Sequence, residues 1–158
     1  MPLTKDHDFN SFYCGNNKID SFLKNSAIYE QEEMLSRTYL DCFNNNVIGF
    51  FTLSANSIEV LAIDTIDSVE EFLESDYPAI DITKLAITKK FQEKGIGTYT
   101  LKRAIGKILS LSKNIGCRYV TLDSVKNKVD FYKKHGFKIV DIYKDDEYTK
   151  MYLNMTQI

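Results

Sequence analysis

"FQEKGIGTYTLKRAIG", residues 91–106, places Gly95 and Gly97 just before a run of residues with helical spacing. The first backbone N–H groups of a helix lack intrahelical partners, and the helix dipole adds partial positive charge there. Glycine lets such N–H groups approach an anion with no Cβ in between. The stretch therefore predicts a phosphate-binding turn to which Lys94 adds a mobile charge. A tight strand-to-helix turn without a ligand is the alternative.

The spacing around these glycines excludes two common phosphate loops. No Gly-Lys-Ser/Thr follows Gly97, so the turn is not a Walker A loop. No third glycine stands at the position that the dinucleotide-binding fingerprint requires.

The composition is that of an ordinary globular protein, and 158 residues predict one domain, residues 1–158. No apolar run approaches the roughly 18 residues of a membrane span, and the polar N-terminus lacks a signal-peptide core. The three cysteines, Cys14, Cys42 and Cys117, are odd in number and far apart. This spacing argues against disulfides or a zinc site, so we expect a cytoplasmic protein without a metal.

Charge is unevenly distributed along the chain. Residues 84–138 hold fourteen Lys or Arg against three Asp or Glu, whereas the remainder holds six against nineteen. The basic stretch indicates either solvated helix faces or a surface for an anionic ligand.

Hydrophobic periodicity predicts mixed strands and helices. Strands are expected at 37–43, 47–60, 79–88, 117–125, 137–144 and 148–155. Helices are expected at 15–34, at 66–77 as a short acidic helix, after Gly97, and at 128–136. The helix after Gly97 should end at Gly116 and bury one face, made of Leu101, Ala104, Ile105, Ile108, Leu109 and Ile115. Hairpins at both ends and a strand–helix–strand crossover in the middle predict an α/β or mixed α+β class, not a doubly wound sheet.

Three motifs resemble those of the GNAT superfamily of N-acetyltransferases. "QEKGIG" (92–97) resembles the family's Q/R-x-x-G-x-G/A phosphate loop, and "KLAIT" (84–88) resembles its acetyl-CoA-contacting strand. "FYKKHGF" (131–137) resembles its tyrosine-bearing helix-to-strand junction. The resemblance implies a central mixed, mostly antiparallel sheet that is splayed between two strands and flanked by helices.

The same resemblance implies acetyl-CoA as cosubstrate. The pyrophosphate would lie on the N–H groups of the turn, and the pantetheine arm would pair with the strand backbone. A backbone N–H near Ala86 or Ile87 would then polarise the thioester carbonyl. The implied cofactor-binding residues are Leu85, Ala86, Ile87, Gln92, Glu93, Lys94, Gly95, Ile96, Gly97 and Thr98.

In this family a neutral amine attacks the thioester directly. Tyr132 occupies the general-acid position, where a phenol can protonate the departing thiolate; packing on the pantetheine arm is its alternative role. Asp81 matches a general base that acts through water in some members of the family. The alternative, which the sequence slightly favours, is a solvent-facing residue at the start of the strand. His7 and His135 are isolated, and we assign neither to catalysis.

The acceptor is left open by the sequence. "CGNNKIDSFLKNSA", "SRTYL" and "IGFFTLSANSI", within residues 12–58, resemble the GNAT branch that includes toxins of toxin–antitoxin pairs, which acetylate the amino group of aminoacyl-tRNA. Those toxins tend to carry an apolar residue where this chain has Asp81. The main hypothesis is acetylation of a small-molecule or protein primary amine. The alternatives are such a toxin, with tRNA and an antitoxin as partners, or a non-catalytic coenzyme A-binding module. A homodimer is left open.

Overall fold

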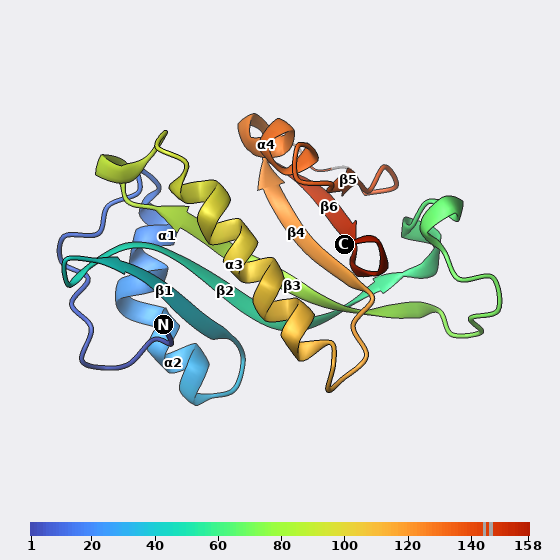
Figure 1. Cartoon of the computed structure of the whole chain (residues 1–158), viewed down its shortest axis with the longest axis horizontal. Coiled ribbons are helices and arrows are strands. Elements are labelled where there is room, and N and C mark those ends of the chain that lie inside the picture. Colours follow the sequence, from blue (N-terminus) through green and yellow to red (C-terminus); the bar gives the residue numbers. More distant parts are fainter. Residues whose placement is uncertain (144, 146) are drawn as a thin grey trace. The chain divides into compact units, whose positions relative to one another are not determined.

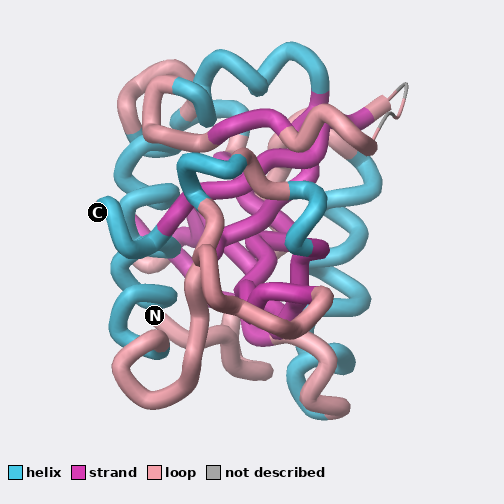
Figure 2. Tube along the Cα trace, turned by 90° about the vertical axis from the view of Figure 1, so that its right-hand side faces the viewer, coloured by secondary structure: helices cyan, strands magenta, loops and turns pink. Residues whose placement is uncertain are grey.

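The computed structural model describes residues 1–143, 145 and 147–158. The chain divides into two compact units, Met1–Ser54 with Ile82–Gly106 and Ala55–Asp81 with Lys107–Ile158. Six strands form a sheet in the order β1-β2-β3-β4-β6-β5, and helices flank it (Figure 1). Figure 2 traces strands, helices and loops along the same chain. The mixed α+β class is confirmed, while the single-domain boundary 1–158 stays a prediction.

Three consecutive helical segments open the first unit, namely α1 (Asn17–Ser21), the π-helical turn η1 (Phe22–Ser26) and α2 (Ala27–Glu32). The side chain of Asn16 caps α1 by accepting from the N–H groups of Lys18 and Ile19. The helix expected at 15–34 is thus present, with one widened turn in its middle.

A hairpin follows, in which β1 (Arg37–Phe43) pairs antiparallel with β2 (Asn46–Glu59). Asn44 and Asn45 make the turn with φ of 49° and 63°. Asparagine tolerates this left-handed region, and two such residues match the twist of a two-residue hairpin. The predicted tight turn is confirmed. The core of this unit is formed by Leu3, Phe12, Phe22, Leu23, Ala27, Leu40, Val47, Phe50 and Ala86.

The second unit contains the start of β3, the strand β4 and the last hairpin. β3 (Asp76–Ile87) begins here and pairs in parallel with β4 (Tyr119–Val125), as its Ala79–Asp81 lie opposite Tyr119–Thr121. β4 pairs antiparallel with β6 (Tyr148–Asn154), which pairs antiparallel with the short β5 (Lys138–Ile139). The mixed, mostly antiparallel sheet is therefore confirmed, and the splay of β3 from β4 beyond Asp81 stays a prediction. The core of this unit is formed by Ile58, Ala62, Ile63, Tyr77, Ala79, Tyr119, Val140 and Tyr152.

The remaining helical segments complete the order of elements. α3 (Ile96–Leu111) begins in the first unit, and α4 (Val129–Lys133) lies in the second. The 3-10 turns are η2 (Val60–Ala62), η3 (Thr65–Asp67), η4 (Lys89–Phe91), η5 (Lys126–Lys128) and η6 (Met155–Gln157). Within residues 1–143, 145 and 147–158, no helix has the length and apolar character needed to cross a membrane.

The prediction of an acidic helix at 66–77 is wrong. The segment forms η3, turns and the start of β3 instead, and Leu73 is 96% exposed. Its acidic residues have no basic partner at helical spacing, and Asp67 is buried in contacts with residues distant in sequence. Tertiary hydrogen bonds therefore decide the conformation here.

Two other element boundaries differ from the prediction. α3 ends at Leu111 rather than at Gly116, because the helix gives way to a turn in which Ser112 Oγ donates to the carbonyl of Leu109 at 2.7 Å. Ile115 consequently lies 68% exposed rather than on a buried face. The strand expected at 137–144 is reduced to β5, and its last residue, 144, lies outside the described residues.

Candidate active site

The predicted phosphate-binding turn lies in the first unit, between η4 and α3. Glu93 and Gly95 adopt left-handed backbone conformations, with φ of 61° and 82°. A Cβ built on Gly95 would meet nothing within 4 Å, so this glycine is required by backbone conformation and not by lack of space. The turn is exposed from Glu93 to Gly95, which leaves it accessible to a ligand.

The start of α3 presents backbone donors at this turn. The N–H of Tyr99 donates to the carbonyl of Gly95 at 3.2 Å, so the N–H groups of Ile96, Gly97 and Thr98 precede that helical bond. Lys94 is exposed, with Nζ 5.8 Å from the centre of the Phe91 ring. Backbone donors at a helix start, the helix dipole and a nearby ammonium together suit a phosphate group.

Gln92 closes the turn against the rest of the first unit. Its Nε2 donates to the carbonyls of Ile87 and Cys14, each at 2.8 Å. The N–H of Tyr13 donates to Thr88 Oγ1 at 3.1 Å, which ties the N-terminal segment to the same strand end. The side-chain amide of Gln92 therefore shapes the loop from within, and the contact of Gln92 with the cofactor stays a prediction.

The helix that carries the turn is fixed to β1. Asp41 is buried and accepts hydrogen bonds from Thr100 Oγ1, at 2.5 Å, and from Arg103. A Cβ on Gly49 of β2 would lie 2.7 Å from Ile87 Cδ1, so glycine there permits close packing of β2 against the end of β3. These contacts hold the start of α3 rigidly behind the phosphate turn.

The strand that resembles the acetyl-CoA-contacting strand is the C-terminal end of β3. Ala86 and Ile87 are buried and Leu85 is half-buried. Beside them, Lys84 places Nζ 4.7 Å from the centre of the Phe22 ring on η1. Leu85, Ala86, Ile87 and the turn thus form one continuous segment of the first unit, as the sequence predicted.

Tyr132 lies on α4 in the second unit. Its ring packs edge-on to Phe131 and Phe137, with centroids 5.1 and 5.7 Å away. Burial among these groups raises the pKa of Tyr132 to about 12, so the phenol stays protonated at every physiological pH. Gly136, with φ of 91°, and the bond from Phe137 N–H to the Tyr132 carbonyl (3.2 Å) end the helical turn, as expected for this junction.

Asp81 is half-buried at the point where β3 faces β4 in the second unit. Its Oδ1 accepts a hydrogen bond from Thr121 Oγ1 at 2.5 Å, and Thr121 Oγ1 in turn accepts from Asn56 Nδ2 at 2.9 Å. Sequence reasoning named Asp81 but missed Thr121, which donates to it, and Asn56, which donates to Thr121. The sequence carries little signal for these two residues, because only the pairing register of β3 with β4 reveals that Thr121 lies opposite Asp81.

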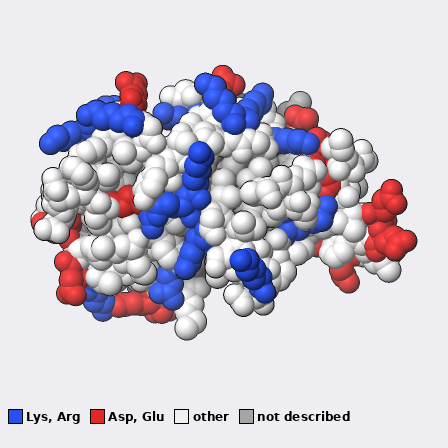
Figure 3. Space-filling view, viewed as in Figure 1, with Lys and Arg blue, Asp and Glu red and all other residues white. Residues whose placement is uncertain are grey.

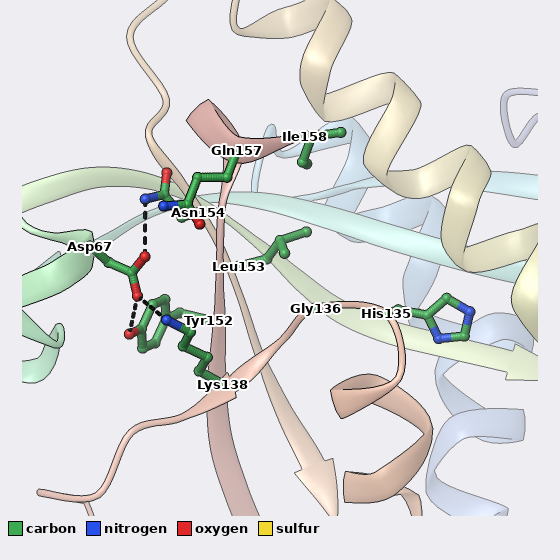
Figure 4. Close-up of a pocket in the computed structure, with 9 residues that line it drawn as sticks. All are labelled: Asp67, His135, Gly136, Lys138, Tyr152, Leu153, Asn154, Gln157 and Ile158. Carbon is green, nitrogen blue, oxygen red and sulfur yellow. Dashed lines mark hydrogen bonds and ion pairs between the residues drawn. The ribbon is translucent and has the colours of Figure 1, made fainter.

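A second polar cluster surrounds Asp67, which sequence reasoning did not single out. The Asp67 carboxylate accepts from Lys138 Nζ at 2.7 Å, Tyr152 at 2.9 Å and Asn154 at 3.3 Å (Figure 4). Although burial alone would raise it, these donors hold the pKa of Asp67 below its usual range. The cluster borders a cavity of about 300 Å³ that also reaches His135.

These contacts indicate a structural cluster rather than catalytic groups. Asp67 is 1% exposed and its backbone carbonyl accepts from Arg118 at 3.1 Å, so its oxygens are engaged within the protein. His135 Nδ1 lies 2.8 Å from the carbonyl of Phe131, consistent with a role at the helix end. No group of three potential metal ligands occurs in the described part of the chain.

The site residues fall into two groups, each defined within its own unit. The first holds the phosphate turn and residues 85–87, and the second holds Asp81 and Tyr132. Together with the mixed sheet, these elements define an α+β protein with an anion-binding turn between a strand and a helix. The individual roles of the site residues stay predictions.

Comparisons with known proteins identify the family. The family model described as "Acetyltransferase (GNAT) domain" matches residues 36–139. The chain belongs to the GNAT acetyltransferases. It is therefore an acyltransferase with acetyl-CoA as cosubstrate, and the alternative of a non-catalytic module is set aside.

Relatives with similar sequences include toxins. A "tRNA-acetylating toxin" of Mycobacterium tuberculosis is 28% identical over 133 residues, which cover 84% of this chain and 79% of the relative. A "Probable toxin TacT" of Sinorhizobium fredii is 24% identical over 142 residues, covering 84% and 78%.

Solved structures share the fold. AtaT complexed with acetyl-methionyl-tRNAfMet superposes with a TM-score of 0.89 at 21% identity, covering 99% of this chain and 94% of that one. AtaTR bound with AcCoA gives 0.82 at 22% identity, covering 99% and 92%.

Proposed function

We propose that the chain is the toxin of a toxin–antitoxin pair, which transfers the acetyl group of acetyl-CoA to the α-amino group of an aminoacyl-tRNA. The observation that carries the proposal is the similarity, over 84% of the chain, to a relative described as a tRNA-acetylating toxin. A small antitoxin protein is the proposed regulatory partner, and the cytoplasm, where charged tRNA is found, is the proposed location.

The surface charge supports a nucleic-acid acceptor. On the face drawn in Figure 3, Lys and Arg gather along the part where α3 lies, and α3 itself contributes the exposed Lys102 and Lys107. Neutralising phosphates with such side chains releases counterions and supplies most of the non-specific affinity for nucleic acid. Asp and Glu gather at other places on this face, on the segment between β2 and β3 and at the lower left of the view.

The chemistry is consistent with the groups present. The phosphate turn would hold the cosubstrate pyrophosphate, and Tyr132 would protonate the coenzyme A thiolate as it leaves. An α-amino group has a pKa of about 8, so a substantial fraction is neutral at physiological pH and the attack needs little basic assistance.

A radiolabel transfer assay tests the proposal. The protein is incubated with [14C]acetyl-CoA and total charged tRNA, and acid-precipitable label is counted; uncharged tRNA and charged tRNA with blocked amino groups are the controls. Label that enters only charged tRNA with free amino groups is the expected result. Label that enters free lysine or a peptide instead, with none in tRNA, would overturn it.

A basic amine acceptor is the second candidate, and one observation favours it. Asp81 is a carboxylate held by Thr121, where the aminoacyl-tRNA toxins tend to have an apolar residue. A lysine amine, with a pKa of about 10.4, must lose a proton before it attacks, at roughly 1.36 kcal/mol per unit of pKa difference. A general base is therefore worth more with that acceptor.

A further inference from the structure

Side chains from three strands meet at Asp81 in the second unit. Asp81 is on β3, Thr121 lies opposite it on β4, and Asn56 comes from β2. Thr121 is fully buried, while Asn56 is at an exposed position. The two hydrogen bonds, 2.9 Å from Asn56 Nδ2 to Thr121 Oγ1 and 2.5 Å from Thr121 Oγ1 to Asp81 Oδ1, form a continuous chain.

The donors and acceptors fix the direction in which these two hydrogen bonds donate, from Asn56 to Thr121 and from Thr121 to Asp81. The amide nitrogen of Asn56 can only donate, so the Thr121 oxygen must accept from it. The hydroxyl then has its single proton available for Asp81. A hydroxyl that donates a hydrogen bond to a carboxylate oxygen favours the ionised form of the carboxyl group. The arrangement therefore suits an Asp81 carboxylate that carries no proton.

We propose that Thr121, itself oriented by Asn56, is a positioning residue that keeps the Asp81 carboxylate ionised and turned to take a proton from the acceptor amine. The inference rests on the proposed amine acetylation, and it deepens that proposal by assigning the control of the base. The amine nitrogen forms a C–N bond to the acetyl carbon, and its proton passes to Asp81, directly or through water. The C–S bond breaks, and the thiolate takes the proton of Tyr132.

Two other polar side chains lie near Thr121 and Asp81 on the sheet, and neither replaces Thr121 as the hydrogen-bond donor described here. Tyr152 lies opposite Thr121 on β6, but its hydroxyl donates to Asp67 at 2.9 Å. Asp123 follows two residues along β4 and is exposed. Thr121 donates to Asp81, and neither Tyr152 nor Asp123 occupies the Thr121 hydroxyl.

The first experiment measures Asp81 directly and needs no acceptor. The side-chain carboxyl carbons of the whole protein are followed by 13C NMR from pH 3 to 7, and Asp81→Asn identifies the Asp81 resonance. In Thr121→Val, which keeps the shape and removes the donor, the titration midpoint of Asp81 should rise by about one pH unit. Thr121→Ser, which keeps the hydroxyl, should restore the original midpoint.

Two further variants keep the test decisive. Thr38 is a buried threonine on β1 whose hydroxyl lies 2.8 Å from Thr52 Oγ1, so Thr38→Val controls for the loss of any buried hydroxyl. Asn56→Ala changes an exposed position and should raise the Asp81 midpoint by less than Thr121→Val does. If Thr121→Val does not fold, the Asp81 midpoint of Asn56→Ala still tests the hydrogen-bonded chain. An unchanged Asp81 midpoint in both Thr121→Val and Asn56→Ala would overturn the proposal.

The second readout is the ratio of Thr121→Val to wild-type kcat from pH 4 to 8 with saturating charged tRNA. Protonation of the acceptor amine, with a pKa of about 8, lowers kcat equally in both proteins and cancels in this ratio. The ratio should fall toward pH 4, where the raised Asp81 midpoint leaves less of the carboxylate ionised in the variant. A shifted NMR midpoint with a ratio that stays constant would refute the catalytic part of the proposal. If the wild type acetylates no charged tRNA, the proposed acceptor is wrong, and the ratio is measured with a lysine amine while the NMR result still decides the Thr121–Asp81 contact.

Discussion

Replacing Gly95 by alanine should weaken acetyl-CoA binding without unfolding the protein. The residue has a φ of 82°, and a new Cβ would meet nothing within 4 Å, so the substitution adds conformational strain but no clash. A left-handed conformation costs an L-residue about 1–2 kcal/mol. Because the turn is exposed, the unliganded loop can relax away from this conformation, and binding must then restore it.

The free energy of this strain is subtracted from the free energy of acetyl-CoA binding. At about 1.4 kcal/mol per tenfold change, the dissociation constant for acetyl-CoA should rise about 5- to 30-fold in Gly95→Ala. Gly95→Asn should lose less, because asparagine adopts this region more readily. Isothermal titration calorimetry measures both values, and circular dichroism checks that the variants are folded.

A matched control comes from Gly116, which also has open space around its Cβ position but no left-handed φ. Gly116→Ala should leave the dissociation constant unchanged. If folded Gly95→Ala binds acetyl-CoA as tightly as the wild type, the left-handed turn does not form the cosubstrate site.

Three further predictions concern the turn, the acid and the polar cluster. Gly97→Asp should abolish detectable acetyl-CoA binding in calorimetry, because a carboxylate would face the phosphates; retained affinity in a folded variant argues against the turn as the phosphate site. Tyr132→Phe should lower kcat by about 10²–10⁴-fold with little change in acetyl-CoA affinity. Since burial raises the pKa of Tyr132 to about 12, the ratio of wild-type to Tyr132→Phe kcat should stay constant from pH 7 to 10, and a ratio that falls toward pH 10 contradicts this. Asp67→Ala should lower the free energy of unfolding by about 2–4 kcal/mol in urea titrations at pH 7, because the donors around it lose their acceptor. The folded-state pKa of Asp67 is lowered, so this contribution should be present above pH 4 and fade as the pH falls further, whereas an Asp67→Ala penalty that is the same at pH 3 and pH 7 would refute it.

Local signals in the sequence determined the elements that carry the site. Gly95 and Gly97 before a helical run predicted the turn at the start of α3, and "NNN" predicted the hairpin between β1 and β2. Gly136 predicted the end of α4 beside Tyr132. Each signal is a backbone requirement of a few adjacent residues, which the sequence specifies without reference to the rest of the chain.

Only the tertiary structure decided the features that depend on residues far apart in sequence. The segment 66–77 has an apolar pattern typical of a helix, yet the burial of Asp67 against Lys138, Tyr152 and Asn154 excludes that conformation. Helical periodicity alone is a weak determinant where long-range hydrogen bonds compete with it. The chain from Asn56 through Thr121 to Asp81 likewise depends on strand register, because a one-residue slip would turn each side chain to the opposite face of the sheet.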